Sequence, residues 1–121
     1  MTYESLKDVE SKIAHKVTFR VARMSFARRM ELMRQIRELA RRIEFLEAGQ
    51  ELGEKMEAAL IQGEVDRVYL MWGLVEVSGL EVDGAAATPT ALAENGPEDL
   101  FREALAAVKA ETGLSMAERK N

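Results

Sequence analysis

The chain has 121 residues, of which 47% are apolar and 31% are charged, with two prolines and no cysteine. These values are typical of one globular domain, and they exclude extensive disorder, disulfides and thiol chemistry. No apolar run reaches the roughly 18 residues of a membrane span, and the N-terminus lacks an apolar signal core. We therefore expect a single domain, residues 1–121, in the cytoplasm and without a membrane partner.

The net charge of −4 hides a division of the chain into a basic and an acidic part. Residues 12–42 contain ten Lys and Arg against two acids, whereas residues 44–121 contain six against sixteen. Such asymmetry concerns partners and association and not the fold. Three explanations are open: the basic segment packs beside an acidic one in the same molecule, binds an acidic partner, or binds nucleic acid.

The first predicted element is a strand. Apolar and polar side chains alternate over residues 9–22, most clearly at Lys16–Ala22, and this period of two predicts a half-buried strand. Because a lone strand leaves its backbone groups unpaired, we expect it to pair with residues 80–82, with residues 9–14 or with another subunit. The only histidine, His15, lies on its apolar side, where a packed or edge position is expected.

Two matched apolar stripes come next. A helix is predicted over Phe26–Ala48, with Ser25 as its N-cap and Gly49 at its end. The link through Gly49 and Gly53 is short, and short links join antiparallel helices. The sequence therefore predicts a helical hairpin. Its two stripes share the spacing 4, 3, 4, 3 and consist of Leu32, Ile36, Leu39, Ile43 and Leu46, and of Ile61, Val65, Val68, Trp72 and Val75.

The apolar run within Ile61–Asp83 continues the second helix in this interpretation. Its first half is amphipathic, whereas its second half is apolar all round, as in a helix that is buried on several sides. Gly73, beside the only tryptophan, is expected to allow a neighbouring backbone to approach closely.

Smaller elements are predicted after this run. Residues 80–84 indicate an extended piece and a turn, and residues 85–89 a loop. Thr88 caps a short helix from Pro89 to Glu94, Pro97 opens another that ends at Gly113, and Ser115 with Glu118 form a capping box. The predicted class is α+β and predominantly α-helical: a long helical hairpin, a short N-terminal strand or hairpin, and smaller C-terminal helices.

The residues give no arrangement that would carry catalysis. Metal sites of the usual kinds need several His or Cys ligands, and a serine nucleophile would have only His15 as its base. Neither an EF-hand loop nor a glycine-rich phosphate loop occurs. We therefore expect no enzymatic activity, no metal and no cofactor.

A basic patch on the first predicted helix offers an alternative function. Arginines at these positions can contact phosphates, but neither a helix-turn-helix nor an aromatic stacking platform accompanies them, and the whole chain is acidic. A nucleic-acid-binding or regulatory protein that uses residues 26–48 is thus an alternative, and nucleic acid is not the expected partner. The patch consists of Arg28, Arg29, Arg34, Arg37, Arg41 and Arg42.

Four stretches together resemble one family. They are FRVARMSFARRMEL at residues 19–32, MWGLVEVSGLEVDG at 71–84, the ATP–helix–GPEDL arrangement at 87–100, and LSMAERKN at 114–121. The chain resembles small proteins encoded in tail modules of phages and prophages, in particular tail assembly chaperones. The resemblance implies a mainly α-helical fold with a small β component, no catalytic motif, and binding to the tape-measure or tail-tube protein in the host cytoplasm.

The expected partner surface is the apolar end of the second predicted helix, completed by methionines that adapt to different contacts. The same residues would form the core if no partner binds there. A permanent minor component of the tail is a further alternative. We also expect a homo-oligomer, because the strand needs pairing and the two charged parts are complementary. The proposed surface consists of Met24, Met30, Met33, Tyr69, Met71, Trp72 and Leu74.

Overall fold

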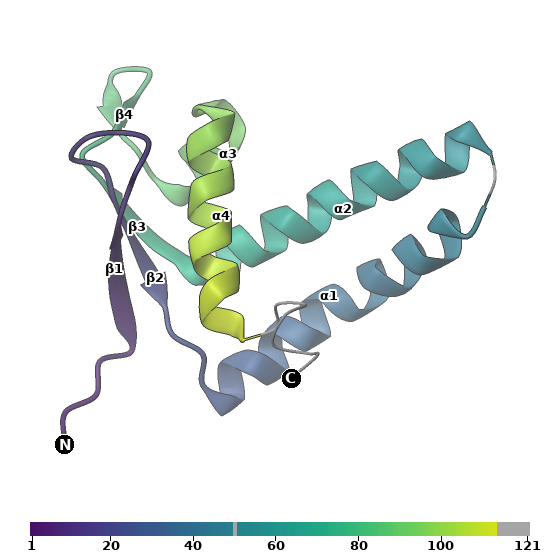
Figure 1. Ribbon diagram of the computed structural model, residues 1–121, viewed down its shortest axis with the longest axis horizontal. Coiled ribbons are helices and arrows are strands. Elements are labelled where there is room, and N and C mark those ends of the chain that lie inside the picture. The colour runs from purple at the N-terminus through teal and green to yellow at the C-terminus, as the bar shows by residue number, and fades with distance from the viewer. Residues whose placement is uncertain (50, 114–121) are drawn as a thin grey trace.

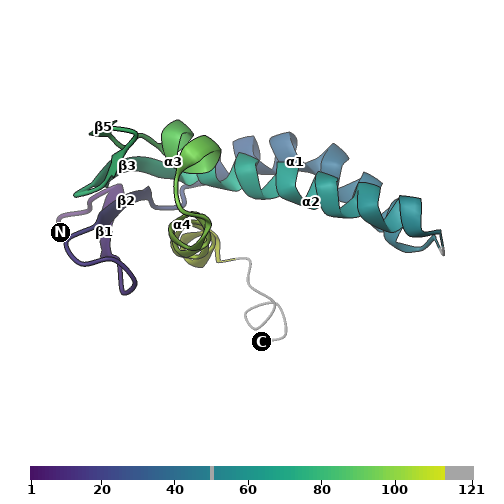
Figure 2. The same ribbon diagram turned by 90° about the horizontal axis from the view of Figure 1, so that it is seen from above.

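The structure is a computed structural model and describes residues 1–49 and 51–113, so the capping box predicted at Ser115 and Glu118 lies outside it. A three-stranded antiparallel sheet, a long helical hairpin and two shorter C-terminal helices make up most of the described chain (Figure 1). This arrangement is the predicted class, α+β and predominantly α-helical. Figure 2 shows that the hairpin projects to one side of a body formed by the sheet and the C-terminal helices.

The sheet has the strand order β1-β2-β3, so the central strand pairs on both sides within one chain. A bulge lies between Arg20 and Val21 of β2. Phe19 and Val21 are fully buried, because alternate side chains of this strand point into the core. Of the three predicted partners, only residues 9–14 contribute, through Val9 and Glu10 of β1, and the other neighbour is β3. Residues 80–82 and another subunit do not pair with β2. The strands are β1 Leu6–Glu10, β2 Thr18–Ala22 and β3 Leu74–Ser78.

The alternating residues 9–22 do not form one strand, and this prediction is wrong in its extent. The polypeptide turns between β1 and β2, where Lys16 has a φ of 67°. The side chain of Ser11 accepts hydrogen bonds from the backbone N–H groups of Ile13 and Ala14, and these bonds favour a turn over an extended ladder. His15 is exposed in this turn and does not lie on an apolar side.

The helical hairpin is confirmed. Helix α1 spans Phe26–Glu47 and α2 spans Leu52–Gly73, and Ser25 caps α1 by accepting a hydrogen bond from the N–H of Arg28. The distal half of the hairpin is held by a cluster of side chains from these two helices alone. That cluster consists of Ile43, Ile61 and Val65 with Ile36, Leu39, Leu46 and Tyr69.

The helical interpretation of the apolar end is wrong beyond Gly73. Residues Leu74–Ser78 form β3, in which Leu74 and Val77 are buried and Val75 is exposed. Pairing with β2 satisfies the backbone there, and β-branched residues fit a pleated strand well. Long-range pairing therefore overrides the apolar period that extends the helix.

The C-terminal elements follow the predicted turn and cap residues. Asp83 and Gly84 have φ values of 53° and 83° in the turn between β4 and β5. The loop predicted at residues 85–89 is wrong at Ala85 and Ala86, which form β5 because they pair with β4. Thr88 caps α3 by accepting a hydrogen bond from the N–H of Ala91, and α4 ends at Gly113 in a left-handed conformation. The elements are β4 Glu81–Val82, β5 Ala85–Ala86, α3 Pro89–Asn95 and α4 Glu98–Thr112.

Helix α4 closes the main core. Its residues Leu105 and Val108 are buried with Phe19 of β2 and Leu70 of α2 in one cluster, which joins the sheet to the root of the hairpin. Gly73 allows this packing, although what approaches it is a side chain and not the predicted backbone. A Cβ at Gly73 would lie 2.4 Å from Cγ1 of Val108.

Two glycines of α2 should therefore respond to alanine in opposite directions. We expect Gly73→Ala to lower the free energy of unfolding by about 1–3 kcal/mol, because the new methyl overlaps Val108. Gly63→Ala should raise it by about 1 kcal/mol, since a Cβ there meets nothing within 4 Å and alanine favours the helix. Urea unfolding checks both, and a destabilisation by Gly73→Ala that persists in full with Val108→Ala would contradict the overlap.

Candidate functional site

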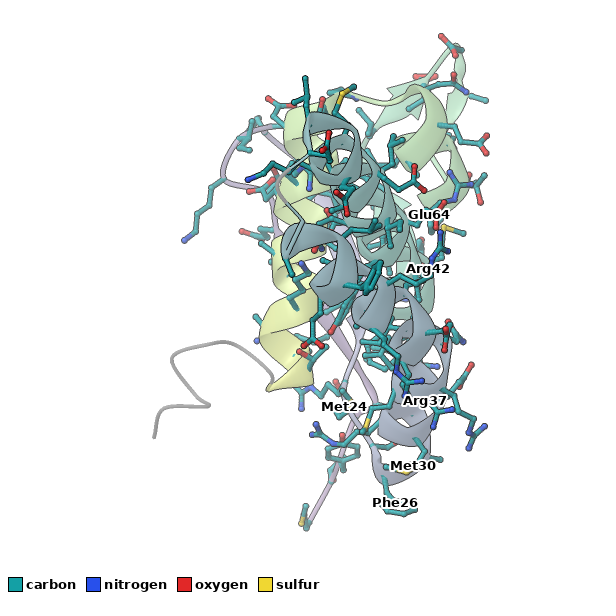
Figure 3. All side chains as sticks on the ribbon, turned by 90° about the vertical axis from the view of Figure 1, so that its right-hand side faces the viewer. Met24, Phe26, Met30, Arg37, Arg42 and Glu64 are labelled. Atoms are coloured by element: carbon teal, nitrogen blue, oxygen red, sulfur yellow. The ribbon has the colours of Figure 1, made fainter. Side chains whose placement is uncertain are left out.

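The seven residues of the expected partner surface do not form one groove. Trp72 and Leu74 are buried in the main core, and Met24 and Tyr69 pack against it. Figure 3 places Met24 and Met30 beside Phe26 at one end of the hairpin. The remaining two are exposed and lie on different helices, Met33 on α1 and Met71 on α2.

One hollow at the root of the hairpin brings together three of the predicted site residues: Arg28, Met71 and Trp72. Its volume is about 460 Å³, and it lies between α1 and α2. The three lining residues of α1 are spaced three and four residues apart, so they share one side of that helix. The four lining residues of α2 are two pairs of consecutive residues, one helical turn apart. The lining residues are Arg28, Glu31, Gln35, Arg67, Val68, Met71 and Trp72.

Arg28 determines the chemistry of this hollow. Its guanidinium carbon lies 4.5 Å from the centre of the Trp72 ring, within range of a cation–π interaction. Its Nη2 also donates a hydrogen bond to the carbonyl oxygen of Trp72 at the end of α2. Arg28 thus joins α1 to the last turn of α2. Its 44-residue separation from Trp72 made the pair invisible in the sequence.

Two buried donors beside the hollow lack an acceptor among the described residues. They are Nε of Arg28 and Nε1 of Trp72. A buried donor without an acceptor costs about 1–3 kcal/mol. Both atoms are inaccessible at the surface, so they offer no contact to a group that enters the hollow.

The predicted basic patch is divided by the fold. Arg28 faces Trp72, and Arg29 donates to the carbonyl oxygen of Thr112 at 3.4 Å. Arg42 pairs with Glu57 across the hairpin at 3.7 Å, which is the interhelical ion pair expected if basic and acidic segments pack together. The other three arginines, Arg34, Arg37 and Arg41, stay on the exposed side of α1, and only Arg41 has an ion-pair partner among the described residues.

Asp66 is a buried carboxylate that the sequence did not reveal. It accepts hydrogen bonds from Arg102 at 2.8 Å, Gln62 at 3.1 Å and Lys109 at 3.3 Å, and so joins α2 to α4. Burial alone would raise the pKa of Asp66, but hydrogen bonds from Arg102 and Gln62 and the nearby Lys109 hold the pKa below its usual value. Glu64, two residues before Asp66, is exposed, so the acidic sequence around Asp66 does not indicate that Asp66 is buried.

The described residues, 1–49 and 51–113, contain no group of three or more His, Cys, Asp or Glu side chains that could hold a metal ion. Within the same ranges, no helix is long and apolar enough to cross a membrane. Comparison of the chain with protein-family models, curated proteins and solved structures gives no match.

The Asp66 cluster makes stability depend on pH. Because its folded pKa is lowered, its contribution is present above the unfolded pKa and is lost as pH falls through the folded pKa. We expect Asp66→Asn to lower the free energy of unfolding by about 1–3 kcal/mol at pH 7. The difference in unfolding free energy between variant and parent should shrink below about pH 4, because Asp66 of the parent then becomes protonated. Asp8→Asn is the control, because the exposed Asp8–Arg20 pair should contribute little. Urea unfolding with an equal loss at pH 7 and pH 3 would contradict this role.

Proposed function

We propose that this protein is a non-enzymatic assembly factor of a phage or prophage tail that binds the tape-measure protein in the host cytoplasm. Tail assembly chaperones, which the sequence resembles, are its nearest functional model. The observation that carries the proposal is the hollow at the root of the hairpin, which unites Met71 and Trp72 with Arg28. Binding there would shield an apolar segment of the partner until tail-tube subunits surround it.

The lining of the hollow suits a side chain or backbone segment of another protein. Val68 and Met71 offer apolar contact, and the flexible thioether of methionine adapts to different shapes. The exposed side chains of Glu31, Gln35 and Arg67 offer polar contacts to the same segment. Four of the seven lining residues are charged or polar, so a partner segment that fits there carries polar groups beside its apolar ones.

The alternative of nucleic-acid binding has a smaller surface than the sequence indicated. Arg28, Arg29 and Arg42 already contact groups within the protein. The exposed set that is left for phosphates consists of Arg34, Arg37 and Arg41. A permanent tail component would have the same surfaces as a chaperone, and its presence in finished tails would distinguish the two.

The only tryptophan offers a direct measurement of partner binding. We expect a tape-measure fragment from the same tail module to change the fluorescence of Trp72. Met71→Asp should weaken binding at least about tenfold, because a charge replaces an apolar contact. Met71 is 41% exposed, so this variant should remain folded. Ala106→Asp, an exposed change on α4, is the matched control. Equal binding by Met71→Asp and the parent would reject this hollow as the site.

Salt and the exposed arginines separate protein binding from nucleic-acid binding. Replacing Arg34, Arg37 and Arg41 by Gln should leave tape-measure binding within about twofold and remove any binding to DNA or RNA. Binding of the parent to the fragment should also tolerate a change from about 50 to 200 mM salt, over which phosphate contacts weaken steeply. Fluorescence and filter binding measure these affinities. Loss of the fragment by a folded triple variant would place the partner on the arginines instead.

A further inference from the structure

A second hollow lies farther out along the hairpin, and α1 and α2 both contribute to it. Its volume is about 390 Å³, and its apolar lining comes from Phe45 and Leu46 of α1. The side chain of Phe45 is 77% exposed, so its ring is accessible to another molecule. We call this hollow the distal hollow and the one beside Trp72 the root hollow. The distal hollow is lined by Glu38, Arg41, Arg42, Phe45, Leu46 and Glu57.

Both hollows open on the same side of the hairpin. Six of the α1 residues that line them recur with the spacing 3, 4, 3, 4, 3, which places them in one row along the helix. Figure 3 shows Arg42 of α1 and Glu64 of α2 on one side of the hairpin, away from α4. We call this side the open side. Its row on α1 is about 25 Å long and consists of Arg28, Glu31, Gln35, Glu38, Arg42 and Phe45.

The walls of the open side favour a helix over an extended segment. Both walls are helices, whose backbone groups are bonded within each helix, so a partner meets only side chains there. An extended segment would leave its own backbone groups unpaired between these walls, whereas a helix pairs them internally.

The separation of the two hollows matches the repeat of a helix. Their lining residues on α1 are centred about 11 residues apart, which corresponds to about 17 Å or three helical turns. A partner helix with apolar residues at positions i, i+4, i+7 and i+11 presents them on one face. Such a face would reach both hollows at once.

Two carboxylates define the charge that suits this helix. Glu31 and Glu64 are exposed on opposite walls of the open side, and neither forms an ion pair with another described residue. Because Arg42 pairs with Glu57 across the hairpin, the antiparallel register places the two carboxylate-bearing residues within about 6 Å of each other along the hairpin axis. A Lys or Arg between the apolar positions of the partner helix would therefore meet both carboxylates, and opposite charges at such positions favour the correct partner.

We propose that a basic amphipathic helix of the partner protein lies along the open side. Its apolar residues enter the root and distal hollows, and a Lys or Arg lies between Glu31 and Glu64. The helix has about 17 residues, because it follows the full row on α1. This inference rests on the proposed function for the identity of the partner, and it adds the secondary structure, length and charge of the segment that binds.

A photocrosslink tests where the partner lies. The chain has no cysteine, so a benzophenone label can be attached to one introduced cysteine. We expect a label on Glu38→Cys, in the row of the open side, to crosslink to a tape-measure fragment from the same tail module. Ala40→Cys is the matched control, because residue 40 is exposed on another side of the same helix and its label should not reach the fragment.

Two exposed aromatic residues of α1 provide a second test. Phe45→Asp should weaken binding of the fragment at least about tenfold, because a charge replaces an apolar contact in the distal hollow. Phe26→Asp is the control that should bind like the parent, since Phe26 is 81% exposed and lies outside both hollows. Glu31→Gln/Glu64→Gln should weaken binding about threefold, because exposed ion pairs are individually weak. The fluorescence of Trp72 measures these affinities.

The outcomes separate this inference from the proposed function. Equal binding by Phe45→Asp and the parent, equal crosslinking from both labels, or a bound fragment that gains no helical circular dichroism would overturn the inference alone. Crosslinks between two copies of this chain in place of the fragment would overturn it in favour of self-association. A parent that does not bind the fragment would reject the proposed function together with the inference. Circular dichroism checks that each variant is folded, and the crosslink decides the matter if Phe45→Asp unfolds.

Discussion

Helix α2 continues directly into strand β3 at Gly73, and this junction determines how the helical hairpin meets the body formed by the sheet and the C-terminal helices. At Gly73, Val108 of α4 occupies the space of a side chain, so helix, strand and C-terminal helix approach one another closely. The residue before Gly73 is Trp72, and the guanidinium of Arg28 lies over its ring. Arg28 also donates a hydrogen bond to the carbonyl oxygen of Trp72 at the end of the helix. These contacts fix the direction in which the hairpin leaves the body. The hollow exists because the same junction brings α1 and α2 together at their root.

The two halves of the hairpin differ in how they are supported. The root shares the main core with the sheet and α4, and the Asp66 cluster adds polar contacts between α2 and α4. The distal half depends on Ile43, Ile61 and Val65 and on the partly buried side chains around them. Two helices cannot bury more than one side each in this way. Exposed apolar residues on their outer sides are the geometric consequence.

The sequence predicted most where structure is local. Ser25, Thr88 and Gly113 end or begin helices as expected, because capping depends on neighbouring residues. Failures occurred where distant segments decide the outcome. Leu74–Ser78 has a helix-compatible pattern but pairs with β2, and residues 9–22 alternate through a turn. Periodicity carries no information about such pairing.

The candidate site was predictable only in part for the same reason. Trp72 and Met71 were singled out by composition, and Arg28 by charge, but no local pattern joined them in one hollow. The burial of Asp66 depends on Arg102 and Lys109 from a helix that follows much later in the chain. The residues next to Asp66 in the sequence give no sign of this contact between helices.

Strand β1 has a consequence for the solution behaviour of the protein. It borders the sheet on one side, where an unpaired row of backbone groups could accept a foreign strand. Lys7, Asp8 and Glu10 are exposed along it, and charged side chains on a border strand oppose the stacking of identical chains. The sheet is thereby protected from growing into cross-β aggregates. Concentrated protein that nevertheless precipitates should yield deposits that keep their helical circular dichroism.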